Sequence, residues 1–231
     1  MEVMAVVRMD VKDLPLFKDL SVDEVKRFIK QTGATTKVYP KGAHLLNAYE
    51  PNPNIGVVVE GMAQLVSEDR MGNETVGPRI EHGAIIGSTS AILNLEGNLA
   101  AVEALSEIKV LWIPYQALIT AGPKLSRIHG IVMKNMLEAF CVKHILMMEK
   151  IEVLSHRALR ERVILYLLQS EKRQQREDGS IQVPGRVQLA KELECNRSAL
   201  TREISSMKRE GILNCGRHWM KLNKDKLNDE T

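Results

Sequence analysis

A long stretch without helix breakers most constrains how this chain can fold. From Ser126 no proline occurs until Pro184, and apolar residues recur there at alternating steps of four and three, the a/d seam of a coiled coil. About 30 residues at ~1.5 Å each give a helix too long for one small domain to cover. We expect residues 126–155 to form a dimerisation helix, with an ordinary core helix as the alternative. The predicted seam consists of Met133, Leu137, Phe140, His144, Met147, Ile151 and Leu154.

The residues before this helix have the pattern of a β-rich domain. Residues 33–97 hold nine of the 15 glycines, placed between short apolar runs such as IGVVVEG and MAQLV. Glycine supplies the positive φ that tight turns need, so this spacing predicts many short strands, with DRMGNET at 69–75 as the clearest hairpin turn. A further apolar run continues the strands to Pro114. Ahead of them, SVDEVKRFIKQTG predicts a helix with a capping box of Ser21 and Glu24.

The residues after the long helix predict a helix from about His156, a charged loop, and then two helices joined by a short turn. GRVQLAKEL places Leu189 and Leu193 on its inner side. The next helix, within CNRSALTREISSMKREGIL, has an apolar face of Leu200, Ile204 and Met207. GILNCGRHWMKL then reads as two short strands around Gly216. This order is typical of a winged helix-turn-helix.

The polar face of the second helix is suited to duplex DNA. Arginine can bind phosphates or pair bidentately with guanine, and serine can hydrogen-bond to several bases. Asn196 is a suitable N-cap, and the N-terminus of the helix favours a phosphate. A solvated basic helix is the alternative. The predicted DNA-binding residues are Asn196, Arg197, Ser198, Thr201, Arg202, Ser205, Arg209, Arg217 and His218.

The distribution of charge along the chain agrees with a DNA-binding C-terminal region. Residues 156–231 hold 16 Lys and Arg against 11 Asp and Glu, whereas residues 1–155 hold 16 against 18. The C-terminal third is therefore the part that suits a polyanion.

Composition excludes several other classes of protein. An apolar fraction of 44% and a charged fraction of 26% are ordinary for a globular domain, and no run approaches the roughly 18 apolar residues of a membrane span. The N-terminus has acids where a secretory signal has basic residues, so we expect a cytoplasmic protein without a membrane partner. The sequence has no nucleophile elbow, phosphate-binding glycine loop, HExxH motif or paired metal ligands, so we do not expect an enzyme.

These segments together resemble the superfamily of the cyclic-AMP receptor protein and the fumarate-nitrate reductase regulator (Crp/Fnr), over nearly the whole chain. YPKGAHLLNAYEPNPNIGVVVEGMAQLV is similar to the start of the family's effector roll. The resemblance implies an α+β fold with a β-roll (a double-stranded β-helix, cupin-like) at 1–125, the dimerisation helix at 126–155 and a winged helix-turn-helix DNA-binding domain at 156–231, with a hinge at Ser155 and His156. It implies a homodimeric transcription regulator that reads a pseudo-palindrome in double-stranded DNA, with RNA polymerase as a partner.

The most specific part of the resemblance is the DNA-binding motif. Arg197 and Arg202 match the two arginines that contact DNA in the family's SRETVGR-like motif. Ser198 replaces the base-reading glutamate of that motif, so we do not assume the family's guanine-rich half-site. Glu194 stands where helix-turn-helix units often have glycine, which predicts slight strain in the turn.

The resemblance also bears on the effector, which the sequence leaves unidentified. In GAIIGSTSAILNLEGNLAAVEA, Ser88 stands where the family's glutamate binds ribose, and Asn98 and Leu99 replace the arginine and serine that bind the cyclic phosphate. Because burying a phosphate without a cation is costly, we do not expect cyclic AMP to bind. The candidate pocket residues are Ser88, Thr89, Asn98, Leu99, Phe140, Cys141 and His144.

The sequence bears on three other kinds of effector or sensor: an iron-sulfur cluster, haem and a reactive cysteine. Three widely spaced cysteines cannot supply the four thiolates of an iron-sulfur cluster. Haem remains possible, with His44, His82 or His144 as axial ligand; alternatively, the first two lie in surface loops and the third is a polar seam residue. Cys141 is either a redox switch or a plain cysteine. A regulatory subunit that acts through a protein partner is the alternative function.

Overall fold

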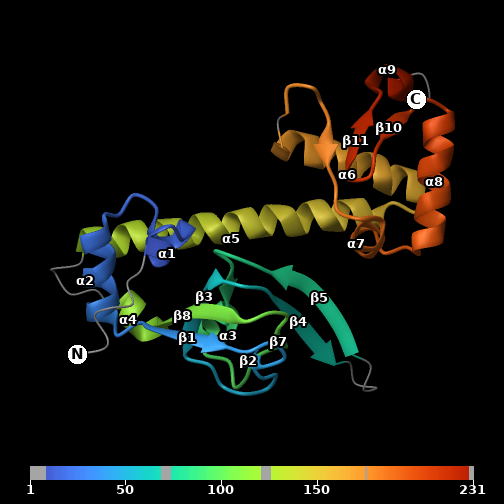
Figure 1. Ribbon diagram of the computed structural model, residues 1–231. Coiled ribbons are helices and arrows are strands. Elements are labelled where there is room, and N and C mark those ends of the chain that lie inside the picture. The colour runs from blue at the N-terminus through green and yellow to red at the C-terminus, as the bar shows by residue number, and fades with distance from the viewer. Residues whose placement is uncertain (1–8, 69–73, 121–125, 175, 229–231) are drawn as a thin grey trace. The chain divides into compact units, whose positions relative to one another are not determined.

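The computed structural model describes residues 9–120 except 69–73, and residues 126–228 except 175. The chain divides into two compact units, Met1–Phe140 and Cys141–Thr231, and the division falls inside the longest helix, α5 (Ser126–Ser155). Figure 1 shows α5 as one unbroken helix. The long helix predicted from residue 126 is therefore present. None of the described helices has the length and apolarity that a bilayer crossing requires.

The first unit begins with short helical segments that pack against α5. They are α1 (Met9–Lys12), a 3-10 turn (Pro15–Phe17) and α2 (Val22–Thr32). The predicted capping box of α2 is confirmed: the Ser21 hydroxyl accepts from the Glu24 N–H, and the Glu24 carboxylate accepts from the Ser21 N–H at 2.8 Å. Asn135 of α5 donates to the carbonyls of Leu16 and Lys18 at 3.0 and 2.8 Å, which fastens the helix to this segment.

Two hydrogen bonds to its carboxylate lower the pKa of Glu24. The larger effect comes from the Ser21 backbone N–H and the smaller from the Ser21 hydroxyl. The carboxylate also pairs with Arg127 at the start of α5. Because the pKa is lowered in the folded chain, the stability that this charge contributes is present above the ordinary value of 4.5. It is lost as the pH falls through the folded value.

The strands of the first unit form a roll of two antiparallel sheets. The sheet orders are β1-β8-β3-β6 and β2-β7-β4-β5. The predicted strand-rich region is thus confirmed, and the turn predicted at 69–75 lies largely outside the described residues, between the paired strands β4 and β5. The strands are β1 (Thr35–Tyr39), β2 (His44–Leu46), β3 (Asn54–Glu60), β4 (Ala63–Glu68), β5 (Glu74–Ile80), β6 (Ile85–Ile86), β7 (Ala101–Ala104) and β8 (Ile108–Pro114).

Two helices interrupt or follow the strands, α3 (Ser88–Leu93) and α4 (Tyr115–Ile119). Helix α3 was not predicted, because its short apolar run lies among glycines that indicate strands and turns. Gly87 precedes it with φ 69, and a Cβ there would lie 2.4 Å from Asn52 Nδ2. The glycine is therefore required both by the backbone conformation and by the close approach of Asn52.

The second unit contains the remaining helices and a three-stranded sheet of order β10-β11-β9 (Figure 1). Helix α6 begins at Leu159, so the predicted start near His156 was wrong; α5 itself continues to Ser155 and leaves a short connection. The inward positions predicted for Leu189, Leu193 and Leu200 are confirmed, since each is at most 1% exposed. The elements are α6 (Leu159–Gln174), β9 (Ile181–Gln182), α7 (Arg186–Glu192), α8 (Arg197–Arg209), β10 (Leu213–Cys215), β11 (Trp219–Leu222) and α9 (Lys224–Asn228).

Replacing Ser21 tests the capping box. Ser21→Ala removes the side-chain acceptor of the cap, and we expect the free energy of unfolding to fall by about 1 kcal/mol in urea titrations. Ser21→Thr keeps the hydroxyl and should unfold like the parent. Equal stability of the alanine variant and the parent would show that the box contributes nothing.

Candidate nucleic-acid interface

Helix α8 has one narrow buried edge and a broad polar face. Leu200, Ile204 and Met207 form the edge and are 0, 3 and 0% exposed. Asn196 occupies the N-cap position in an extended conformation, but its side chain makes no capping hydrogen bond. The nine residues predicted to bind DNA are all exposed: Asn196, Arg197, Ser198, Thr201, Arg202, Ser205, Arg209, Arg217 and His218.

Two hydroxyls on this face already donate hydrogen bonds to carbonyls within the helix. Thr201 donates to the Arg197 carbonyl and Ser205 to the Thr201 carbonyl, both at 2.8 Å. Each hydroxyl oxygen can still accept a hydrogen bond. Among the described residues, no acid pairs with Arg197 or Arg202, so both guanidinium groups are available to an anion.

An open hollow of about 600 Å³ lies beside α8. It brings Thr201, Arg202, Ser205 and Arg209 together on one surface, as the helical spacing predicted. Its other lining residues include Glu203 and Leu159, the first residue of α6. The hollow is therefore open, and two cationic side chains, Arg202 and Arg209, are part of its lining.

The turn between α7 and α8 is held from outside. Glu194 has φ 48, which confirms the strain predicted for a non-glycine residue there. Arg162 of α6 donates to the carbonyls of Leu193 and Glu194 at 2.9 and 3.5 Å. Lys150 of α5 lies 3.7 Å from the Glu194 carboxylate. Neighbouring helices thus fix a backbone conformation that the local sequence disfavours.

The hairpin after α8 presents the remaining candidates. Arg217 and His218 lie between β10 and β11, and the Gly216 N–H donates to the Trp219 carbonyl at 3.0 Å. A Cβ on Gly216 would lie 2.3 Å from Trp219 Nε1, so the indole packs where only glycine fits. Strand β9 adds a third strand that was not predicted.

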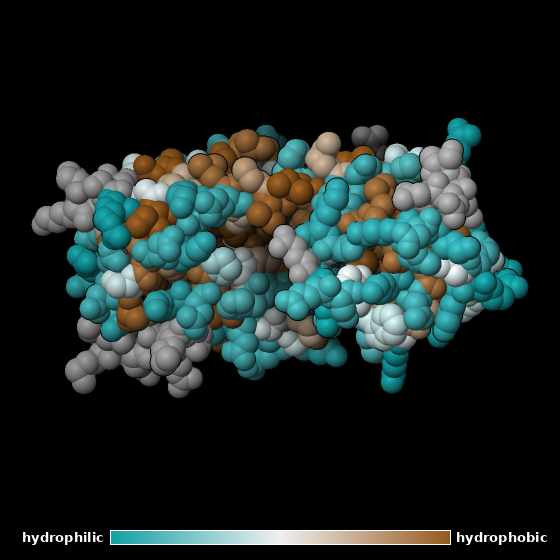
Figure 2. Space-filling model, turned by 90° about the horizontal axis from the view of Figure 1, so that it is seen from above, coloured by the Kyte–Doolittle hydropathy of each residue, from teal (hydrophilic) through white to brown (hydrophobic). Residues whose placement is uncertain are grey.

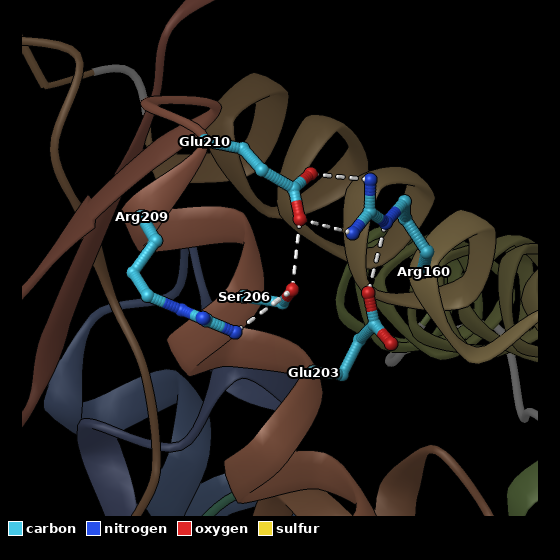
Figure 3. A network of polar contacts seen from close by, with 5 residues as sticks. All are labelled: Arg160, Glu203, Ser206, Arg209 and Glu210. Atoms are coloured by element: carbon cyan, nitrogen blue, oxygen red, sulfur yellow. Dashed lines mark hydrogen bonds and ion pairs between the residues drawn. The ribbon is translucent and has the colours of Figure 1, made fainter.

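A network of charges that links α6 and α8 was also not predicted (Figure 3). Arg160 Nε donates to Glu203 at 2.8 Å, and its two terminal nitrogens donate to the two carboxylate oxygens of Glu210 at 2.6 and 2.9 Å. The hydrogen bonds from Arg160 lower the pKa of Glu210. The seven-residue spacing of Glu203 and Glu210 could have indicated the network. It places two acids on one side of a helix whose other charged side chains are basic.

The candidate effector residues lie in different environments. Ser88 is half-buried and Thr89 exposed at the start of α3, whereas Leu99 is 71% exposed. Asn98 is buried and donates to the Asn47 carbonyl at 2.9 Å, while its Oδ1 atom is buried without a partner. Phe140 packs at the edge of the first core, and Cys141 and His144 are exposed on α5. The Asn98 side chain therefore supports a loop of the roll.

The predicted seam of α5 is apolar and largely uncovered in a single chain. Leu137, Met147 and Ile151 are 57, 56 and 61% exposed, and His144 is exposed between them. Met133, Phe140 and Leu154 are half-buried. Figure 2 shows apolar side chains gathered along the stretch that α5 crosses.

The candidate metal ligands and hinge residues are placed as follows. His44 contacts Asn47 Oδ1 at 3.1 Å, and His82 Nδ1 lies 2.8 Å from the Val59 carbonyl. In the described part of the chain, no three His, Cys, Asp or Glu side chains are grouped to hold a metal ion. Ser155 donates to the Glu152 carbonyl at 2.7 Å, and His156 contacts Glu161 in the connection to α6.

Glycine at position 194 should relieve the strain of the turn. We expect Glu194→Gly to raise the free energy of unfolding by about 1 kcal/mol, because φ 48 is costly for a residue with a Cβ. Glu194→Gln is the control: it removes the exposed pairing with Lys150, should change stability by less than about 0.5 kcal/mol, and keeps the strain. Chemical denaturation of the three proteins compares them, and a glycine variant no more stable than the glutamine variant would contradict the expectation.

Comparison with known proteins agrees with this architecture. Residues 36–121 match the model of the cyclic nucleotide-binding domain family. No curated protein matches the chain by sequence. Among solved structures, a variant of CprK complexed with OCPA is 16% identical at TM-score 0.69, covering 90% of this chain and 93% of that one.

Two further solved structures are similar over most of their length. The catabolite activator protein of Thermus thermophilus is 20% identical at TM-score 0.50, with 94% of this chain and 97% of that chain covered. The c-di-GMP-responsive global regulator CLP of Xanthomonas campestris is 16% identical at TM-score 0.54, with 87% and 99% covered. Residues 36–121 thus match the cyclic nucleotide-binding domain family, and the chain shares its fold with these solved structures over most of its length.

Proposed function

We propose that this chain is a homodimeric transcription regulator that responds to an effector and binds double-stranded DNA with a winged helix-turn-helix at residues 156–231. The observation that carries the proposal is the division of α8 into a buried apolar edge and an exposed face of hydrogen-bonding and cationic side chains. An ordinary surface helix needs no such set of unpaired arginines beside a hollow and a hairpin. The proposed role is binding and regulation, without catalysis of a reaction.

In this proposal α8 is the recognition helix and enters the major groove. Its N-terminal residues Arg197 and Ser198 meet base edges or the phosphates beside them, and the hairpin tip carries Arg217 and His218 to the backbone. Because a serine stands at position 198, this position can donate to or accept from more than one base. Two such helices in a symmetric dimer would read half-sites about one helical turn, roughly 10 base pairs, apart.

The dimer in this proposal forms along α5. Three apolar residues of the predicted seam, Leu137, Met147 and Ile151, are more than half exposed in the single chain. An apolar helical surface of this length is unfavourable in water, and a second copy would cover its seam face with identical residues. His144 in the seam would favour one register.

The effector in this proposal binds the roll and is not cyclic AMP. The positions that would bind the cyclic phosphate hold Asn98, which is engaged with Asn47, and Leu99, which is exposed. CprK was solved with OCPA, and CLP is described as responsive to c-di-GMP, so proteins of this fold differ in what they bind. Haem on His44, His82 or His144 is a second candidate input. Effector binding would act through α5 and the connection at Ser155 and His156, with RNA polymerase as a further partner.

Arg202 provides the first test. If Arg202 reads a base, Arg202→Ala should weaken specific binding by about 1–3 kcal/mol and relax discrimination at one base position. Lys172→Ala, an exposed cation on α6, is the control and should leave sequence preference unchanged. Fluorescence anisotropy with a duplex selected from a random library gives both values. If the parent protein binds no duplex in a salt-dependent manner, a protein partner becomes the better explanation of this surface.

The seam provides the second test. Met147→Glu places a charge in the predicted interface and should convert the dimer to a monomer, whereas Val142→Glu, 57% exposed and outside the predicted seam, should leave the dimer intact. Native mass spectrometry of protein purified without oxygen measures the assembly against the chain mass of 26.0 kDa, and also any bound haem or metabolite. A parent protein that is monomeric would contradict the proposed dimer.

A further inference from the structure

The surface that faces DNA in the proposed function contains two acids as well as cations. Residues 197–210 carry four basic side chains and two acidic ones, Glu203 and Glu210. Glu203 lines the same hollow as Arg202 and Arg209. A free carboxylate at this place would repel the phosphates that the arginines attract.

Arg160 meets both carboxylates from the first turn of α6. Its Nε lies 2.8 Å from Glu203, and its Nη1 and Nη2 lie 2.6 and 2.9 Å from the two oxygens of Glu210. The side chains of Arg160, Glu203 and Glu210 are 31, 26 and 37% exposed, so the group is screened less than a pair on open surface. All three guanidinium nitrogens thus bond to the carboxylates.

The network continues toward the DNA-facing side of α8. The Ser206 hydroxyl donates to Glu210 at 2.8 Å, and Arg209 Nη2 approaches the Ser206 oxygen at 3.5 Å (Figure 3). Glu210 therefore accepts from two side chains, Arg160 and Ser206. Arg209, one of the residues proposed to bind DNA, is oriented at the far end of this chain of contacts.

We propose that Arg160 is a positioning residue for DNA binding: it bonds to both Glu203 and Glu210 and offsets one of their two negative charges, so that the basic side chains of α8 outweigh the acids on the face that meets phosphates. This inference rests on the proposed function, since DNA is the ligand. The fork of the guanidinium group is essential to it, because a lysine at position 160 supplies one compact charge and cannot bond to both carboxylates in this geometry.

Four full-length proteins test the proposal: the parent, Arg160→Gln, Arg173→Gln, and the triple variant Arg160→Gln/Glu203→Gln/Glu210→Gln. Arg173 is the matched control, because it lies on the same helix and pairs with a glutamate of α5, Glu149. Dissociation constants are measured over a range of salt for two probes, a duplex selected by the parent from a random library and a random-sequence duplex. Thermal unfolding of each protein is recorded alongside.

We expect Arg160→Gln to weaken binding roughly tenfold at low salt, and Arg173→Gln to weaken it by less than about twofold. The triple variant should recover to within about threefold of the parent, even if its unfolding temperature remains low, because the uncovered carboxylates are gone. A purely structural bridge would leave the triple variant as weak as Arg160→Gln, and that result overturns the proposal.

The other outcomes are equally decisive. Unchanged binding by Arg160→Gln overturns the proposed role of Arg160 while leaving the proposed function intact. Equal losses in the Arg160 and Arg173 variants mean that only the net charge of α6 matters, which also overturns it. A parent protein that binds neither duplex overturns the proposed function, and the role of Arg160 with it.

Discussion

The apolar surface of α5 is the constraint on which the rest of the structure depends. Both compact units draw part of their core from this helix: Ile128, Val132 and Met136 are buried in the first, and Val153 in the second. Between these anchored ends lies a stretch whose apolar side chains are about half exposed, from Val142 to Met148. The helix is therefore held at both ends by packing within the chain, while its middle presents exposed apolar side chains.

In the second unit, helix α8 separates apolar side chains from charged ones. Its core needs only one edge of α8, since Leu200, Ile204 and Met207 complete the packing of α6, α7 and the sheet. Most of the surface of α8 is therefore not needed for packing the core. Arg197 and Arg202 on the open face make no ion pair with an acid in the described part of the chain, whereas Arg160 of α6 bonds to both acids of residues 197–210. The exposed arginines of this face and the arginine that bonds to its acids thus come from different helices, α8 and α6.

Features set by short-range spacing could be predicted from the sequence, and those set by tertiary contacts could not. The capping box of Ser21 and the inward positions of Leu189 and Leu193 follow from residues a few positions apart, whereas the strain at Glu194 was predicted from the family resemblance. Helix α3 could not be predicted because STSAIL is too short to distinguish from a strand, and its start depends on the left-handed Gly87 beside Asn52. The bonds of Arg160 join residues 43 and 50 positions apart, which no local pattern indicates.

Strand β3 has a consequence for how the first unit responds to strain. Its side chains alternate between two cores: Ile55, Val57 and Val59 pack with the helical segments and the first turns of α5, whereas Val58 packs inside the roll. The strand is buried on both faces along these residues and separates the two cores. Because packed interiors are nearly incompressible, the roll cannot swell or contract at Val58 without displacing the layer that grips α5. The interior of the roll and the base of the long helix are therefore mechanically one body, separated by the thickness of a single strand.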